Sequence, residues 1–187
     1  VFEAFDEYHR TGVPKLENVT FEIGLEPMVA LLRLQQGMAD TLGDGIPPAQ
    51  FMQVMNDPNQ SKNVIEGGQL HTGYITMNTR MAPFDNVMVR KAVNMAVNKD
   101  RIVRIINGRA VPANQPLPPT MPGYAKEYKG YPFDPEGAKK MLSDAGLANG
   151  FSTELFVYNT DPNPRIAQAI QQDLSLIHIS EPTRRTT

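Results

Sequence analysis

The chain has 187 residues, which is enough for one ordinary domain or for parts of two. Its net charge of −2 argues against the strongly basic surface that nucleic-acid-binding proteins need, and the absence of cysteine excludes disulfides and thiolate catalysis. The longest apolar run, Met28 to Leu32, is too short to cross a bilayer. No signal peptide is visible, and the sequence opens on Val1, so we expect its N-terminal segment to be missing.

The first half of the sequence predicts short elements separated by turns. Alternating β-branched and polar residues indicate strands, and proline or acidic residues followed by an apolar stripe indicate helix starts. The predicted elements are, in chain order, a strand at 19–23, a helix from Glu26 to Gly37, a helix from Pro47, a candidate strand at 62–65 and an extended segment at 70–77. Between the last two, Gly67-Gly68 predicts a flexible break.

Helices dominate the prediction for the second half. Asp85 and Asn98 are expected to cap two successive helices, and Asp134-Pro135-Glu136 is a strong start signal for a third. The proline-rich stretch 111–131 is predicted to be a surface loop. A strand at 151–158, a polar turn at 159–163 and a helix from Pro164 complete the order. Strands that alternate with helices indicate an α/β fold.

The sequence offers no convincing catalytic constellation. His9 and His71 have no ligand partners at helical spacing, and Gly67-Gly68 lacks the setting of a phosphate-binding loop. Asp40 and Asp44 form a carboxylate pair, but a solvated or capping role explains them more simply. An α/β hydrolase would need a Gly-x-Ser-x-Gly elbow, which the sequence does not contain. We therefore expect no enzyme, no catalytic residue, no metal and no cofactor.

The segment from Tyr158 to Arg165 is the best candidate for ligand binding. It follows the end of a predicted strand and leads into a helix N-terminus, where open α/β sheets present ligands. Its aromatic, amide, acidic and guanidinium groups suit a zwitterionic or hydrogen-bonding ligand. From the local sequence alone, an ordinary solvated connection is an equally good interpretation.

Five segments, taken together and in order, resemble the family-5 extracellular solute-binding proteins, which include dipeptide, oligopeptide, nickel and glutathione binders. The segments are Arg33–Asp40, Asp44–Pro48, Pro83–Val103, Pro116–Tyr124 and Tyr131–Gly146. The clearest is the Pro-Phe-Asp helix start at Pro83, which follows a segment ending in Asn78. The resemblance covers nearly everything from Tyr8 to Asp173.

The resemblance implies an α/β fold that is part of a two-lobed periplasmic-binding-protein type II clamp, truncated at both ends. Residues 1–68 would be the end of the first lobe, 69–77 the crossing between lobes, and 78–173 the start of the second lobe. The family analogy also places the 158–165 loop at the cleft. It implies ligand contacts by Tyr158, Asn159, Asp161 and Arg165. The loop departs in detail from the dipeptide-binding pattern, which leaves the solute open.

The function implied by the resemblance is that of the substrate-binding component of an ABC importer. Such a protein captures peptides or similar small solutes between its lobes and delivers them to permease subunits in the membrane. We expect a periplasmic or extracellular location, with membrane association through a partner or a lipid anchor upstream of Val1. We also expect a monomer at full length and no nucleic-acid partner. The alternatives are a ligand-sensing domain of a transcriptional regulator and an α/β hydrolase.

The end of the chain resembles something other than a natural protein. The run from Leu174 to Arg184 looks like a translated sequencing-library transposon adapter. Residues 180–187 also lack periodicity and turn residues. We therefore predict that 174–187 is a non-native tail and exclude it from the fold. A genuine short strand at 174–179 followed by a disordered end is the alternative.

Overall fold

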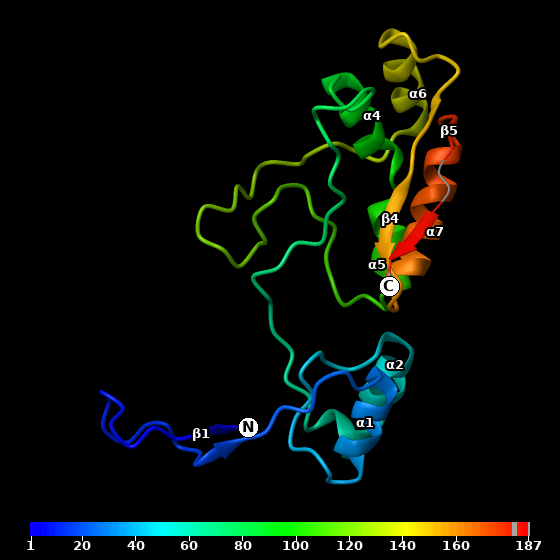
Figure 1. The fold of residues 1–187 in the computed structure, drawn as a ribbon. Helices are drawn as coiled ribbons and strands as arrows, with labels where there is room; N and C mark the ends of the chain where they lie inside the picture. Colours follow the sequence, from blue (N-terminus) through cyan, green and yellow to red (C-terminus); the bar gives the residue numbers. More distant parts are fainter. Residues whose placement is uncertain (181–182, 187) are drawn as a thin grey trace. The chain divides into compact units, whose positions relative to one another are not determined.

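The computed structural model describes residues 1–180 and 183–186, and the chain divides into two compact units (Figure 1). Unit 1 comprises residues 1–50 and unit 2 comprises residues 51–187. The boundary lies within a helix rather than in the predicted crossing at 69–77, so the predicted lobes 1–68 and 78–173 stay a prediction.

Unit 1 contains little regular structure. Two short strands, β1 (Phe2–Glu3) and β2 (Asn18–Val19), pair antiparallel, and α1 spans Pro27–Gln35. An ion pair joins Arg33 Nη2 to Glu22 Oε1 at 2.8 Å. Within residues 1–50, Leu31 alone is buried. Since burial of apolar surface is the main stabilising term in folding, this unit has a small core of its own.

Unit 2 contains most of the secondary structure. In chain order its elements are α2 (Pro48–Asn56, which begins in unit 1), α3 (Pro58–Ser61), α4 (Val87–Ala96), α5 (Lys99–Ile105), α6 (Pro135–Asp144), β3 (Phe151–Ser152), β4 (Leu155–Tyr158), α7 (Asn163–Ser175), β5 (Ile179–Ser180) and β6 (Thr183–Thr186). β3 pairs with β5 and β4 pairs with β6, both in parallel. Parallel strands need a crossover connection, which α7 provides (Figure 1).

The core of unit 2 lies between three helices and the short strands. Apolar residues on α4 recur at the spacing of one helical face, and Ala92, Ala96 and Ala138 are 0% exposed. Small side chains at these positions let α4 and α6 approach closely. The buried cluster consists of Val89, Ala92, Val93, Ala96, Val97, Ala138, Leu142, Ile170, Leu174, Ile177 and Ile179.

Two of the three predicted helix caps are confirmed. The side chain of Asn98 accepts a hydrogen bond from the Arg101 amide, and that of Asp134 accepts one from the Gly137 amide, both at 2.9 Å. A Cβ at Gly137 would collide with the Asp134 carboxylate, so glycine leaves room for this cap. The cap predicted at Asp85 is wrong by one residue. Asn86 caps α4 instead, because its side chain reaches the Met88 amide at 2.8 Å.

The predicted strands are shorter than expected. The strand expected at 19–23 is confined to Asn18–Val19, which is as far as its partner β1 extends. The candidate strand at 62–65 is wrong. The backbone N–H groups of Asn63 and Val64 donate to the carbonyl oxygens of Gln60 and Ser61, which makes this stretch a turn at the end of α3. The strand expected at 151–158 splits into β3 and β4, which pair with different partners.

Residues that we excluded as a tail take part in the fold. α7 runs on to Ser175, and Leu174, Ile177 and Ile179 are 2%, 1% and 2% exposed. The backbone of β6 also pairs with β4 beyond this point. The alternative strand at 174–179 is likewise misplaced, since β5 is confined to Ile179–Ser180. We missed this packing because the resemblance to an adapter removed these apolar residues from the fold. The non-native origin of 174–187 stays a prediction.

Candidate functional site

The candidate binding loop connects the end of β4 to the start of α7. Tyr158 is the last residue of β4 and Arg165 lies in the first turn of α7. All four predicted contact residues, Tyr158, Asn159, Asp161 and Arg165, are exposed. The loop therefore has the position expected for ligand binding at the carboxyl end of a strand, and its side chains are accessible.

The structure brings two of the four predicted residues together. Arg165 Nε donates to Asp161 Oδ1 at 2.8 Å, and Arg165 Nη2 donates to Asp161 Oδ2 at 3.0 Å. This is a two-bond guanidinium–carboxylate pair, which has a better defined geometry than a single contact. Both side chains remain about half exposed, at 49% and 48%. Each charged group thus keeps a face open to a ligand.

Sequence analysis missed the residues that hold this loop in shape. The Thr160 carbonyl oxygen accepts two hydrogen bonds from Asn163, one from the side-chain Nδ2 and one from the backbone N–H, both at 3.0 Å. These two bonds close the turn just before α7. The sequence did contain a signal for this turn, namely an asparagine three residues after a threonine in a polar segment. Asparagine side chains commonly form hydrogen bonds with nearby backbone groups.

A second missed feature is an exposed aromatic pair on β4. Phe156 and Tyr158 are 60% and 73% exposed, whereas Leu155 and Val157 are half-buried. Residues two apart in a strand lie on the same face, so the two rings share the open face of β4. The alternation of the sequence at 155–158 carried this signal.

The loop borders neither of two shallow cavities that lie elsewhere in the described part of the chain. One cavity, of about 360 Å³, is lined by residues of α6 and of the turn before β5, including Lys139, Ser143 and His178. The other, also about 360 Å³, lies in unit 1 around β1 and β2. The four predicted contact residues of the loop are instead exposed on the surface.

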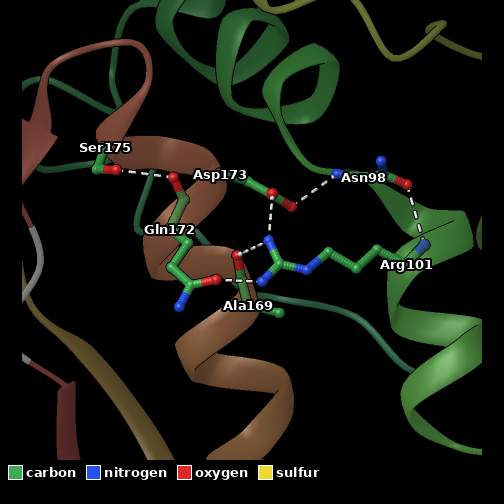
Figure 2. A network of polar contacts seen from close by, with 6 residues as sticks. All are labelled: Asn98, Arg101, Ala169, Gln172, Asp173 and Ser175. Carbon is green, nitrogen blue, oxygen red and sulfur yellow. Dashed lines mark hydrogen bonds and ion pairs between the residues drawn. The ribbon is translucent and has the colours of Figure 1, made fainter.

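A polar network fixes the other end of α7 (Figure 2). Asp173 accepts hydrogen bonds from the Asn98 amide at 3.0 Å and from Arg101 Nη1 at 2.9 Å. Arg101 also donates to the side-chain oxygen of Gln172. Because Asn98 is the N-cap of α5, this network joins the C-terminal turns of α7 to the start of α5. It gives the helix that carries the loop a defined anchor.

Two properties of the described residues bear on the kind of site. In residues 1–180 and 183–186, no three side chains among His, Asp and Glu gather closely enough to hold a metal ion. Over the same residues, no helix is both long and apolar enough to span a membrane.

The sequence profile described as "Bacterial extracellular solute-binding proteins, family 5 Middle" matches residues 1–180. The chain belongs to this family. The match confirms the resemblance that the five segments indicated. It also extends through Leu174–Ser180, where α7 ends and β5 follows.

Curated relatives are similar over almost the whole chain. The dipeptide-binding protein of Escherichia coli K12 is 35% identical over 187 residues, which cover 95% of this chain and 34% of the relative. Heme-binding protein A of Haemophilus influenzae is 34% identical over 186 residues, with 95% and 33% covered. The chain thus spans about a third of the length of the curated relatives it matches.

Solved structures share the fold. The periplasmic binding protein DppA of Helicobacter pylori, in complex with the peptide STSA, matches with a TM-score of 0.73 and 30% identity. That match covers 86% of this chain and 31% of DppA. HbpA2 of Haemophilus parasuis matches with a TM-score of 0.69 and 30% identity, over 91% of this chain and 34% of HbpA2. These matches confirm the predicted α/β fold as part of a family-5 periplasmic binding protein.

Proposed function

We propose that this chain is part of the substrate-binding component of an ABC importer, which captures a peptide or a similar small solute. The observation that carries the proposal is the family match over residues 1–180. Relatives named for dipeptide, glutathione and heme binding support a binding role over a catalytic one. No such relative favours the alternatives of a sensor domain or a hydrolase.

The 158–165 loop would contribute ligand contacts on one side of the binding cleft. Tyr158, Asn159, Asp161 and Arg165 offer an aromatic face, an amide, a carboxylate and a guanidinium group. A peptide carries an ammonium group, a carboxylate and amides, so this set is complementary to it. The Asp161–Arg165 pair would hold both charges in place before the solute arrives, which lowers the entropic cost of binding.

The importer role also implies a location and a partner. The protein would act outside the cytoplasmic membrane, where the DppA relative is described as a periplasmic binding protein. The solute would be delivered to permease subunits, and no bond would be made or broken. Closure of the two lobes would follow as a shift between open and closed states.

The test uses the protein encoded at the source locus, read from its own start codon. Its affinity for a panel of di- and tripeptides is measured by isothermal titration calorimetry, with and without Asp161→Ala and Arg165→Ala. Each substitution removes a charge-assisted contact, so we expect about tenfold weaker binding or more. The matched control is Asp144→Ala, which breaks an exposed pair with Lys140 at the same i,i+4 spacing.

Binding of peptides with loss of affinity in both loop variants, but not in the control, would support the proposal and the site. Normal binding by all variants would reject the loop and leave the function standing. Absence of binding to any peptide or related small solute would reject the function.

A further inference from the structure

The side chain of Asn163 supports the 158–165 loop rather than the helix that it begins. Asn163 is the first residue of α7, and Pro162 before it provides no side-chain cap. A capping side chain accepts hydrogen bonds from amides further along its helix. Nδ2 of Asn163 instead donates back to the Thr160 carbonyl oxygen at 3.0 Å and lies 3.4 Å from Thr160 Oγ1. Two acceptors on one residue thus match the two hydrogens of this amide.

The start of α7 has support that does not depend on the Asn163 side chain. The backbone N–H of Ile166 donates to the Pro162 carbonyl oxygen at 3.1 Å, which closes the first turn of the helix. Ala167 and Ile170 are 1% and 4% exposed, so packing also holds the helix in place. Loss of the Asn163 side chain should therefore loosen the loop and leave α7 intact.

The turn that Asn163 closes contains Asp161. Its ends are Thr160 and Asn163, which are also joined by the backbone bond at 3.0 Å. From inside this turn the Asp161 carboxylate reaches Arg165, with N–O distances of 2.8 and 3.0 Å. Both charged side chains are about half exposed, and exposed ion pairs contribute little stability of their own. The geometry of the pair therefore depends on the turn rather than the reverse.

We propose that Asn163 is a positioning residue for solute binding, which fixes the Asp161 carboxylate beside Arg165 through its bonds to Thr160. This inference rests on the proposed function, in which Asp161 and Arg165 contact the solute. Without the Asn163 side chain the turn keeps one backbone bond, and Asp161 is free to leave Arg165. The solute then has to order the carboxylate as it binds, which lowers the affinity.

The test is a double-mutant cycle on the protein encoded at the source locus, with the tightest-binding peptide of the di- and tripeptide panel as the probe. Isothermal titration calorimetry measures the affinity. We expect Asn163→Ala to weaken binding about fivefold, which is the effect of losing an ordinary side-chain hydrogen bond. In the Asp161→Ala background the same substitution should weaken binding less than about twofold, because Asn163 acts through that carboxylate.

The matched control is Gln168→Ala, which removes an exposed side-chain amide from the same helix. It should leave the affinity unchanged in both backgrounds. Circular dichroism verifies that every variant keeps the helix content of the parent.

A second measurement, made without solute, tests the structural step alone. Exchange of the Arg165 Nε–H with solvent is followed by NMR in protein that contains isotope-labelled arginine. The bond to Asp161 Oδ1 protects this proton in the parent, so we expect faster exchange in Asn163→Ala. Gln168→Ala should match the parent.

Peptide binding by the parent with the same affinity in Asn163→Ala would overturn this inference and leave the proposed function standing. Normal binding by Asp161→Ala, an equally large effect of Asn163→Ala in both backgrounds, or unchanged exchange of the Arg165 proton would overturn it as well. Absence of binding by the parent to any peptide or related small solute would reject the proposed function, and this inference with it.

Discussion

Asp173 Oδ1 and Arg101 Nη1 lie 2.9 Å apart and join two helices whose residues are 72 positions apart in the sequence. Asp173 is 4% exposed and is the one buried charged residue in the described part of the chain. Its second oxygen accepts from the Asn98 amide, so both oxygens of the carboxylate are satisfied. A buried charge is tolerated when it is paired and hydrogen-bonded in this way.

Replacing Asp173 by alanine should strongly destabilise unit 2. The substitution leaves the Asn98 amide and the Arg101 guanidinium without their acceptor, and losing one partner of a buried pair is costly. Because Arg101 remains about one-third exposed, at 35%, water compensates in part, and we expect a loss of about 2–3 kcal/mol. Urea unfolding followed by circular dichroism measures it. Asp144→Ala, which breaks an exposed pair, should cost less than about 0.5 kcal/mol.

Enlarging Ala138 should force α4 and α6 apart. Ala138 is 0% exposed and belongs to the buried cluster, so the extra atoms of Ala138→Leu have no space. Overpacking of this kind costs about 1–3 kcal/mol. The control, Ser143→Leu, introduces the same side chain at an exposed position of the same helix. Equal midpoints of thermal unfolding for the two variants would contradict the close packing of these helices.

The segment after α7 should contribute to stability despite its resemblance to an adapter. Ile177 is 1% exposed and Leu176 is 54% exposed, so the two neighbouring residues form a matched pair. We expect Ile177→Ala to cost about 2–4 kcal/mol and Leu176→Ala less than about 1 kcal/mol in chemical denaturation. A chain ending at Ser175 that unfolds at the same urea concentration as the parent would show that the residues after Ser175 are dispensable.

The side-chain amide of Gln60 and the backbone amide of Asn59 hold the pKa of Asp57 below its ordinary value of 3.8. A lowered folded-state pKa stabilises the fold above the unfolded value, and this contribution is lost as the pH falls through the folded value. Asp57 also caps α3, so protonation weakens the start of that helix. We expect Gln60→Ala to raise the Asp57 pKa towards 3.8 in a carboxyl NMR titration. Gln53→Ala, on the exposed face of α2, should leave it unchanged.

The helical part of the fold could be predicted well from the sequence. Residues 89, 92, 93 and 96 lie on one face by simple periodicity, and the structure buries all four. Asp134-Pro135 likewise marks the start of α6, because a cap and a proline at the first position act locally. Such signals need no knowledge of the rest of the chain.

The strands were harder to predict, because a strand depends on a partner that is distant in sequence. Alternation at 19–23 and at 151–158 showed which residues favour an extended backbone. It could not show that the pairing with β1 stops at Val19, or that Thr153 donates to Ser180 between β3 and β4. The hydrogen bonds of Asp173 were missed for the same reason. Its partners Asn98 and Arg101 are reached only through tertiary packing.

The candidate site was partly predictable. Position at a strand end and residue type selected the 158–165 loop, and the family resemblance selected Asp161 and Arg165 within it. The structure pairs these two residues. The supporting bond from Asn163 to Thr160 depends on turn geometry, which the sequence only suggested.

The separation of the 158–165 loop from the anchor of α7 has a consequence for how the protein can evolve. A 13-residue helix is about 20 Å long, so the exposed loop begins well away from the Asp173 network that fixes the helix. The four candidate contact residues are all exposed, so replacing any of them disturbs no core packing. They are Tyr158, Asn159, Asp161 and Arg165. Selection can therefore alter the chemistry of this loop at little cost to folding stability, and under the proposed function such changes would alter the preferred solute.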